Sequence, residues 1–234
     1  MERNIVIVHF NTPEVTKAEV RSIRKHTPSD CRITIFDNSD KRPFKHIEGV
    51  DIIDNTKGQL IDFKALLNCY PDKIPTTCND WGSVKHCYTV DYLWNIFGEG
   101  FVLMDSDVLV KKDITSFFDA RYPWVGTTYW NPDSPFAKVP RILPFLCWIN
   151  VPLCRDNGIR YYDHIRNWKL HPGGPETWYD TGASFLEDCR AKKLEGKEVD
   201  IYDYIVHYGA GSDFRKEDRV RAWMHKHEDL WKKF

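Results

Sequence analysis

The feature that most constrains the fold is a run of apolar, β-branched residues near the start of the sequence, 4–10 (NIVIVHF). A strand in which apolar and polar residues do not alternate is typical of a parallel sheet that is covered on both faces. A polar turn follows, and Thr12 is placed to cap a helix expected over 14–25. Two more strand-like runs lie at 32–36 and 50–53. Strand, helix and strand at this spacing predict a βαβ unit and an α/β fold.

The rest of the chain divides into a patterned and an irregular part. A helix over 82–97 and a buried strand over 101–104 are expected, whereas 59–80 shows no regular pattern. After Val110 the sequence is rich in Pro, Trp and Tyr, which is typical of a region shaped by what it binds. One late strand is expected over 201–206. An amphipathic helix is predicted for 214–234.

Composition and charge exclude several classes of protein. With 234 residues the chain is long enough for one ordinary domain. The formal net charge of −1 argues against a general nucleic-acid binder, and the 14% aromatic content argues against disorder. No apolar run reaches the roughly 18 residues of a membrane span. The seven cysteines form no CxxC motif, so they are expected to be reduced, mostly buried thiols of a cytoplasmic protein without a leader.

The sharpest motif is Asp105-Ser106-Asp107, which follows the buried strand 101–104 directly. Ligands of open α/β sheets bind at the carboxyl ends of the strands. Two carboxylates this close repel each other and favour a bound cation, and their oxygens suit Mg²⁺ or Mn²⁺. The alternative is an ordinary polar turn at the end of a strand.

A second motif is the segment 207–212 (HYGAGS), in which His207 precedes a glycine-rich turn. A neutral imidazole could complete a metal shell that the two aspartates begin. The glycines would let the backbone near Ser212 approach a phosphate. Alternatively, His207 merely caps a turn.

Polar side chains also end the first two strands and gather in a later loop. His9, Asn11 and Thr12 follow the first strand and Asp37 ends the second, where they could frame a nucleotide, or simply form turns. The loop 172–182 (PGGPETWYDTG) carries the carboxylates Glu176 and Asp180 beside Trp178 and Tyr179. Such a loop suits sugar binding and general base catalysis. Asp180 could equally cap a helix that begins near Thr181.

Taken together, these residues resemble the nucleotide-sugar glycosyltransferases of the GT-A fold, close to glycosyltransferase family 2. The resemblance rests on Asp105-Ser-Asp107, on the late His207 and on Asp37 at the second strand end. Two weaker matches are Asn55-x-x-Gly58 and Ser83-Val-Lys85-His86. It implies one GT-A domain over 1–213, a mostly parallel, Rossmann-like sheet flanked by helices with an irregular acceptor side. Residues 1–110 would bind the nucleotide sugar and 111–213 the acceptor.

The resemblance also implies a mechanism. Asp105, Asp107 and His207 would hold Mn²⁺ or Mg²⁺ against the diphosphate of the donor, with UDP the first choice of nucleotide. Asp180 would deprotonate the acceptor hydroxyl if the enzyme inverts, with Glu176 in reserve. The remaining nucleotide-sugar contacts would come from the following residues: His9, Asn11, Thr12, Asp37, Asn55, Lys85, His86, Ser106 and Ser212. The acceptor would be a saccharide or lipid-linked, as in surface polysaccharide synthesis.

Three other possibilities remain open at this point. The first is a phosphatase of the haloacid dehalogenase type, with Asp105 as nucleophile. Against it, Leu109 stands where that family usually has Thr or Val, and the motif comes late in the sheet. The second is a carbohydrate-binding protein without catalysis. The third concerns 214–234, which could either pack on the core through its tryptophans or rest on the anionic inner face of a membrane. The sequence does not indicate an oligomeric state.

Overall fold

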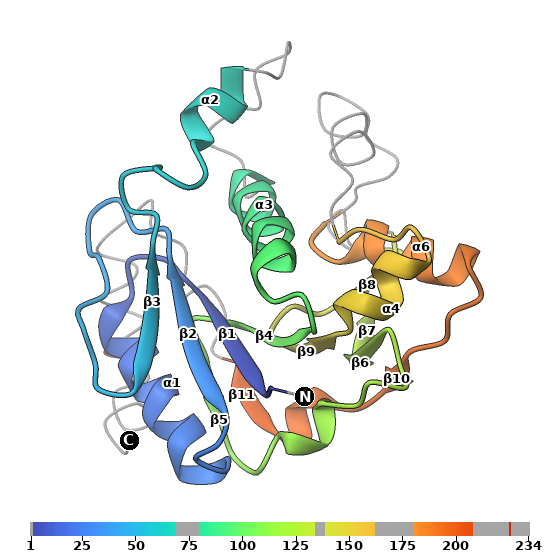
Figure 1. Ribbon diagram of the computed structural model, residues 1–234, viewed down its shortest axis with the longest axis horizontal. Coiled ribbons are helices and arrows are strands. Elements are labelled where there is room, and N and C mark those ends of the chain that lie inside the picture. The colour runs from blue at the N-terminus through green and yellow to red at the C-terminus, as the bar shows by residue number, and fades with distance from the viewer. Residues whose placement is uncertain (1, 69–79, 134–138, 162–179, 208–224, 226–234) are drawn as a thin grey trace.

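A seven-stranded sheet with the order β10-β6-β9-β4-β1-β2-β3 forms the centre of the molecule (Figure 1). The computed structural model describes residues 2–68, 80–133, 139–161, 180–207 and 225. The sheet strands are β1 Asn4–His9, β2 Arg32–Asp37, β3 Val50–Asp54, β4 Phe101–Asp105, β6 Trp124–Gly126, β9 Leu146–Ile149 and β10 Lys197–Glu198. Two two-stranded sheets add β5 Val108–Val110 with β11 Ile205–His207, and β7 Thr128–Tyr129 with β8 Arg141–Ile142.

The helices are short apart from two that flank the sheet. They are α1 Pro13–His26, α2 Phe63–Asn68, α3 Asp80–Ile96, α4 Val151–Asp156 and α6 Ala183–Ala191, with 3₁₀ turns η1 Thr115–Phe117 and η2 Ile201–Asp203. Within the part of the chain that the structure describes, no helix is long and apolar enough to cross a membrane. The five cysteines that lie there are all buried free thiols, as expected.

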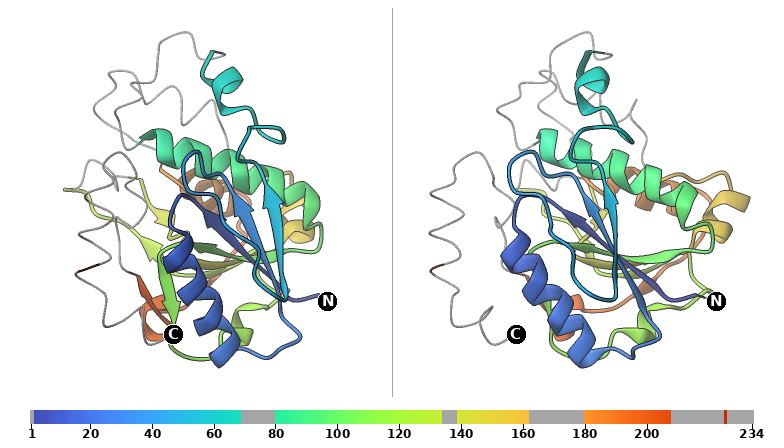
Figure 2. Two further views of the ribbon diagram at one scale, coloured as in Figure 1. Left: turned by 90° about the vertical axis from the view of Figure 1, so that its left-hand side faces the viewer. Right: turned by 60° about the vertical axis from the view of Figure 1, so that its left-hand side comes forward.

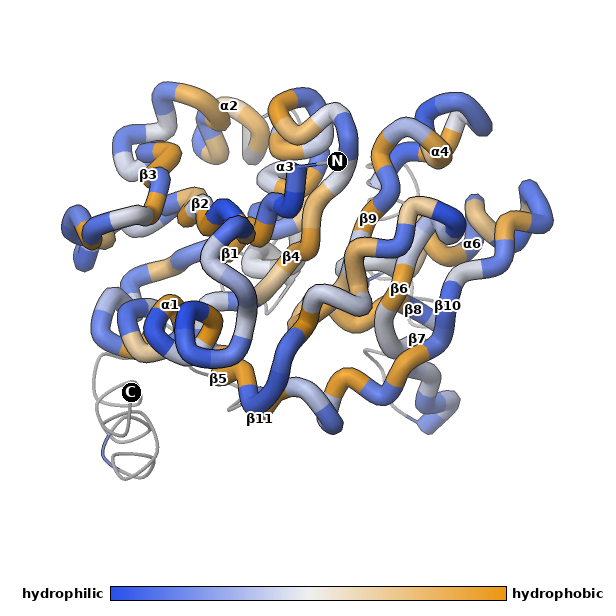
Figure 3. The backbone as a smooth tube through the Cα atoms, turned by 60° about the horizontal axis from the view of Figure 1, so that its bottom comes forward, coloured by the Kyte–Doolittle hydropathy of each residue, from blue (hydrophilic) through white to orange (hydrophobic). Residues whose placement is uncertain are grey.

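The apolar strands fold as the sequence predicts because both of their faces are covered. On β1, Val6 and Val8 belong to the core that contains the α3 side chains, and Ile5 and Ile7 to the core that contains those of α1. The two helices lie on opposite sides of the sheet (Figure 2). Hydrophobic residues therefore run along the central strands β4 and β9 without alternation (Figure 3).

Most of the expected elements are confirmed. The predicted α/β fold is correct, and β1, β2 and β3 pair in parallel, as does β1 with β4. The helix expected over 82–97 spans Asp80–Ile96. The antiparallel strand β9, inserted between β4 and β6, was not predicted. Its segment lies in the apolar region broken by Asn150, which caps α4 by accepting a hydrogen bond from the Leu153 N–H.

Two local predictions were wrong. The segment 59–80 is not irregular throughout, because α2 forms where Asp62 Oδ1 accepts hydrogen bonds from the N–H groups of Lys64 and Ala65. The segment 201–206 is not one strand. Its first part is the 3₁₀ turn η2, capped by the Asp200 side chain, and β11 begins only at Ile205. The predicted helix 214–234 lies outside the described residues, except for His225.

Candidate active site

A buried turn between β4 and β5 presents the two aspartates of the motif. Strand β4 ends at Asp105, and Ser106 and Asp107 lead into β5; these last two residues are each only 2% exposed. Val8 of β1 pairs with Asp105, and His9 pairs with Asp37 of β2. Because these strands are parallel, their carboxyl ends meet at one edge of the sheet. The aspartates of the motif lie at this edge, as the sequence predicted.

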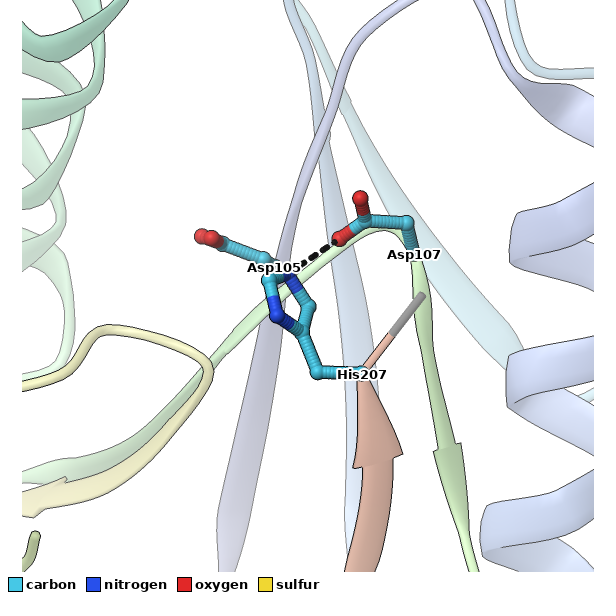
Figure 4. A group of neighbouring side chains, drawn as sticks. All are labelled: Asp105, Asp107 and His207. Atoms are coloured by element: carbon cyan, nitrogen blue, oxygen red, sulfur yellow. Dashed lines mark ion pairs between the residues drawn. The ribbon is translucent and has the colours of Figure 1, made fainter. Parts of the chain in front are cut away.

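His207 reaches this turn from a segment a hundred residues later. Strand β11 pairs antiparallel with β5, so that His207 lies opposite Val108, the residue after Asp107. The Nε2 atom of His207 is 3.2 Å from Oδ1 of Asp107, and its ring stacks on Phe145 with the centroids 3.6 Å apart. Figure 4 shows Asp107 and His207 facing each other, with Asp105 beside them.

Asp105, Asp107 and His207 together form a cluster that could hold a metal ion. Each offers one ligand atom, and these atoms lie within 4.8 Å of one another. Two carboxylate oxygens and one imidazole nitrogen suit a divalent ion such as Mn²⁺, so the residues fit the expected cofactor. The negative charges of Asp107 and Asp105 also act on His207, where they favour the protonated imidazole. Although burial alone would lower the pKa of His207, its bond to Asp107 and the charge of Asp105 raise that pKa overall.

His86 holds the first aspartate from the opposite side. This histidine lies on α3, and its Nε2 is 3.0 Å from Oδ1 of Asp105. Burial acts to raise the pKa of Asp105, but His86, His207 and Arg141 together lower it below its usual value. Asp105 is therefore an ionised carboxylate surrounded by cationic or potentially cationic groups. The sequence predicted His86 as a nucleotide-sugar contact, and the structure brings it to the metal cluster.

Asp180 lies at the same site, paired with an arginine that the sequence analysis missed. Oδ2 of Asp180 is 2.6 Å from Nη1 of Arg141, with both side chains mostly buried. The other oxygen accepts the Thr181 N–H at 2.7 Å. Both carboxylate oxygens of the expected base are thus engaged by the protein. Asp180 does not cap α6, because the N-cap residue is Gly182. The reserve base Glu176 lies outside the described residues.

The polar residues at the first two strand ends hold the loops that follow them. Asn11, at φ 52°, donates to Asp40 and accepts the N–H groups of Lys41 and Arg42. The oxygens of Asp37 accept the N–H groups of Ser39 and Phe44 at 2.9 and 2.6 Å, and the residue is 1% exposed.

Asn55 acts in the same way on the third loop. Its Oδ1 accepts the N–H groups of Leu60 and Ile61, and its amide donates to Asn38, which in turn donates to Thr89 of α3. The structure therefore places Asp37 and Asn55 as loop anchors at the expected edge. Their direct contact with a nucleotide stays a prediction.

A chain of hydroxyl groups connects α1 to the aspartate turn. Thr12 Oγ1 is 3.4 Å from Ser106 Oγ, and Thr16 Oγ1 donates to the Ser106 carbonyl. His9 completes the chain, with Nδ1 2.8 Å from Thr16 Oγ1. Burial lowers the pKa of His9 to about 4, although the charge of Asp37 opposes that shift. The contact of His9 with a nucleotide stays a prediction.

Lys85 lies beside this edge between two aromatic rings. Its Nζ is 5.0 Å from the ring centre of Phe10 and 5.4 Å from that of Phe63. Burial lowers the pKa of Lys85, and Asp40 opposes that shift. The last expected nucleotide-sugar contact, Ser212, lies outside the described residues.

Glu19 is a buried carboxyl group behind the site that the sequence analysis overlooked. It is fully buried on α1, and among the residues that the structure describes neither of its carboxyl oxygens has a hydrogen-bond partner. Burial, and then the charges of Asp107 and Asp105, raise its pKa well above the usual value. A signal was present in the sequence, because Glu19 stands four residues from both Val15 and Ile23 on the apolar face of the helix.

Comparison with solved structures identifies the fold. The mannosyltransferase Ktr4p from S. cerevisiae matches with a TM-score of 0.53 at 10% identity, covering 88% of this chain and 70% of Ktr4p. Mouse xyloside xylosyltransferase 1 matches with a TM-score of 0.50 at 11% identity, over 95% of this chain and 93% of the other. No protein-family model and no curated protein sequence matches the chain.

A further glycosyltransferase matches the chain with a lower TM-score. GlyE from Streptococcus pneumoniae TIGR4 gives a TM-score of 0.49 at 13% identity, and the chain spans about half of its length (97% of this chain, 50% of GlyE). At identities this low, the likeness establishes a fold and no more. The chain has the GT-A glycosyltransferase fold that its sequence motifs predicted.

Proposed function

We propose that this protein is a metal-dependent glycosyltransferase that moves a sugar from a nucleotide-sugar donor to a saccharide acceptor. One observation carries the proposal: Asp105, Asp107 and His207 converge at the carboxyl edge of the sheet of a GT-A fold. The two neighbours with the higher TM-scores are a mannosyltransferase and a xylosyltransferase, which supports sugar transfer. UDP is the first choice of donor nucleotide, and a lipid-linked acceptor in surface polysaccharide synthesis is part of the proposal.

The residues of the site divide into two roles. A divalent ion at Asp105, Asp107 and His207 would offset the negative charge of a diphosphate leaving group. His86 holds Asp105 in place, and Thr12 contacts the hydroxyl and Thr16 the carbonyl of Ser106 in the turn. Ordering these groups before the donor binds lowers the reorganisation that the reaction requires.

Asp180 faces a constraint if it serves as the general base. A base must accept a proton from the acceptor hydroxyl, yet Arg141 and the Thr181 N–H occupy both oxygens of Asp180. A carboxylate oxygen that already accepts a hydrogen bond from a guanidinium is not free to accept one from an acceptor hydroxyl. The base role of Asp180 therefore requires the acceptor hydroxyl to displace or share the contact with Arg141. An Asp180→Asn variant that retains full turnover would rule this role out.

The first experiment is a thermal-shift panel of UDP, GDP and CMP, each with and without Mn²⁺. A ligand at 100 times its Kd stabilises a protein by roughly 2.7 kcal/mol, which is about 5–10 °C at this chain length. The proposal expects a Mn²⁺-dependent shift with one nucleotide. Asp107→Ala should abolish it, whereas the exposed Asp113→Ala should not.

Three results would contradict the proposal. The first is that no nucleotide produces a shift when Mn²⁺ is present. The second is phosphate release from a general phosphatase substrate that depends on Asp105, which would favour the phosphatase alternative. Binding of saccharides without any nucleotide dependence, retained in Asp107→Ala, would instead indicate a non-catalytic carbohydrate-binding protein.

A further inference from the structure

Of the three residues in the metal cluster, His207 alone comes from a distant part of the chain. Asp105 and Asp107 lie two residues apart, so the turn between β4 and β5 fixes how far they are from each other. Strand β11 brings His207 to this turn by pairing with β5. Strand pairing places the main chain of His207, but its side chain can still adopt several rotamers. The orientation of the imidazole ring therefore needs contacts of its own.

The ring of Phe145 supplies such a contact. The ring centroids of Phe145 and His207 are 3.6 Å apart, and the two ring planes differ by 19°. The rings are thus in face-to-face van der Waals contact, and His207 cannot tilt toward Phe145 without displacing it. At the same time, Nε2 of His207 lies 3.2 Å from Oδ1 of Asp107. Phe145 therefore fixes the plane of the His207 ring, and Asp107 fixes the direction in which Nε2 points.

The large sheet holds Phe145 in place. Phe145 directly precedes β9, whose first residue, Leu146, lies opposite Met104 of β4 in an antiparallel pair. Because Asp105 follows Met104, Phe145 and Asp105 are neighbours across the two strands. The ring of Phe145 also packs against the hydrophobic core on the α1 side of the sheet. The stack thus connects His207, from a small sheet, to the strands beside the first aspartate.

Thr127 ties together the two segments that carry the stacked rings. Its carbonyl accepts the N–H of Leu143, two residues before Phe145, at 2.9 Å. Its Oγ1 accepts the N–H of Ile201, four residues before the start of β11, at 3.0 Å. Since one residue holds both segments, the stack belongs to a fixed framework and is not a chance contact between two side chains.

We propose that Phe145 is a positioning residue that orients the ring of His207 for the divalent ion. This role rests on the proposed metal-dependent function, because it concerns a ligand of the same metal cluster. Groups that orient a metal ligand typically change metal affinity by about 10- to 100-fold when they are replaced. We expect a loss near the lower end of that range, because the contact of Phe145 is apolar and contains no hydrogen bond.

The first measurement is the Mn²⁺ affinity of the full chain without nucleotide, by electron paramagnetic resonance of free Mn²⁺. Phe145→Leu removes the flat ring, and Phe145→Tyr keeps it. Phe118→Leu is the matched control, because Phe118 is partly buried against the same core but meets Trp148 edge-on, 5.5 Å between ring centroids. We expect Phe145→Leu to bind Mn²⁺ about tenfold more weakly than wild type, and Phe145→Tyr and Phe118→Leu to bind it as wild type does.

The second measurement uses metal-free protein and tests the stack directly. The ring of Phe145 should shift the ring-proton NMR signals of His207 upfield, and these signals are identified by their loss in His207→Gln. In Phe145→Leu they should move downfield, toward the values of exposed histidines, whereas in Phe118→Leu they should stay unchanged. The urea midpoint of each variant is recorded to show that the variant is folded.

Four results would overturn the positioning role of Phe145. They are equal Mn²⁺ affinity in Phe145→Leu and wild type, an equal loss in Phe118→Leu, a loss in Phe145→Tyr as large as in Phe145→Leu, and unchanged His207 signals in metal-free Phe145→Leu. If wild type binds no Mn²⁺, the proposed metal-dependent function fails as well. If wild type binds Mn²⁺ and the variants bind it equally, only the role of Phe145 fails.

Discussion

At the scale of single residues, three carboxyl groups around one turn differ in their partners. Asp107 and Asp105 each pair with a histidine, His207 and His86, whereas Glu19 has no hydrogen-bond partner within the described part of the chain. An unpaired carboxylate in the protein interior is so unfavourable that the group binds a proton instead. Burial therefore raises the pKa of Glu19 and favours its protonated form, whereas the pKa of Asp105 is lowered by His86, His207 and Arg141.

His86 is expected to act on the metal through Asp105. Replacing a residue that orients a metal ligand typically weakens metal affinity by about 10- to 100-fold. His86→Ala should do so for Mn²⁺, measured by electron paramagnetic resonance of free Mn²⁺, with His86→Gln showing a smaller loss. The exposed His46→Ala is the control. If UDP affinity falls while Mn²⁺ affinity is unchanged, His86 contacts the nucleotide and does not position the metal ligand.

Glu19 makes stability depend on pH. Its pKa is raised in the folded protein, so the unfolded chain releases the proton first as pH rises through the ordinary value of 4.5. The contribution of Glu19 to the free energy of unfolding is fully present below pH 4.5. Above pH 4.5 this contribution falls by about 1.4 kcal/mol per pH unit, until the pH reaches the pKa of Glu19 in the folded protein. Glu19→Gln cannot ionise, so its stability relative to wild type should increase from pH 4.5 upward. Urea unfolding at several pH values measures this, and a constant difference would contradict it.

At the scale of elements, the strand ends and the loops after them form a single anchoring system. Asp37 and Asn55 each accept two main-chain N–H groups, and Asn11 does the same from a left-handed conformation. Their side-chain hydrogen bonds replace those that the chain loses when a strand ends. The sequence placed these residues at the edge correctly, but the residue types alone do not tell whether such a side chain faces a ligand or its own loop.

Gly182, two residues after Asp180, packs the start of α6 against β8, the strand that carries Arg141. It has φ +81°, and a Cβ there would lie 2.5 Å from the Ile142 carbonyl oxygen of β8. Gly182→Ala should therefore combine backbone strain of about 1–3 kcal/mol with a clash against the main chain. Gly158→Ala is the control, because it shares the positive φ (+69°) but has open space around the Cβ. We expect a clearly larger drop in the urea midpoint for Gly182→Ala; equal drops would show that the contact with Ile142 is unimportant.

At the scale of the whole molecule, stability is concentrated in the middle of the large sheet. Strand β1 pairs on both sides with β2 and β4, and its residues are all buried. The hairpin of β7 and β8 has only two residue pairs, and of its four residues only Ile142 is buried. Buried, doubly paired strands open only with global unfolding, whereas small peripheral sheets open locally.

Hydrogen exchange checks this distribution. We expect amides of β1 and β4 to exchange slowest and those of β7 and β8 much faster, measured by mass spectrometry on native protein. Addition of UDP and Mn²⁺ should slow exchange at the β4–β5 turn and at β11 while leaving β10, at the other edge of the large sheet, unchanged. Equal protection of the hairpin and β1 would contradict the expected distribution.

The sequence by itself determined the parallel strands and the edge at which they end, and it predicted the three residues that form the candidate metal-binding cluster. Uninterrupted β-branched runs can be stable only between two covering layers, and parallel strands must end at one edge. The tertiary structure alone decided the partners of the carboxylates: His207 beside Asp107, Arg141 on Asp180, and, among the described residues, none for Glu19. These partners come from segments up to a hundred residues apart, and the register of β5 with β11 and the packing of α1 bring them together. A local pattern carries no information about such contacts, because it describes how each segment folds and not which distant segment it will meet.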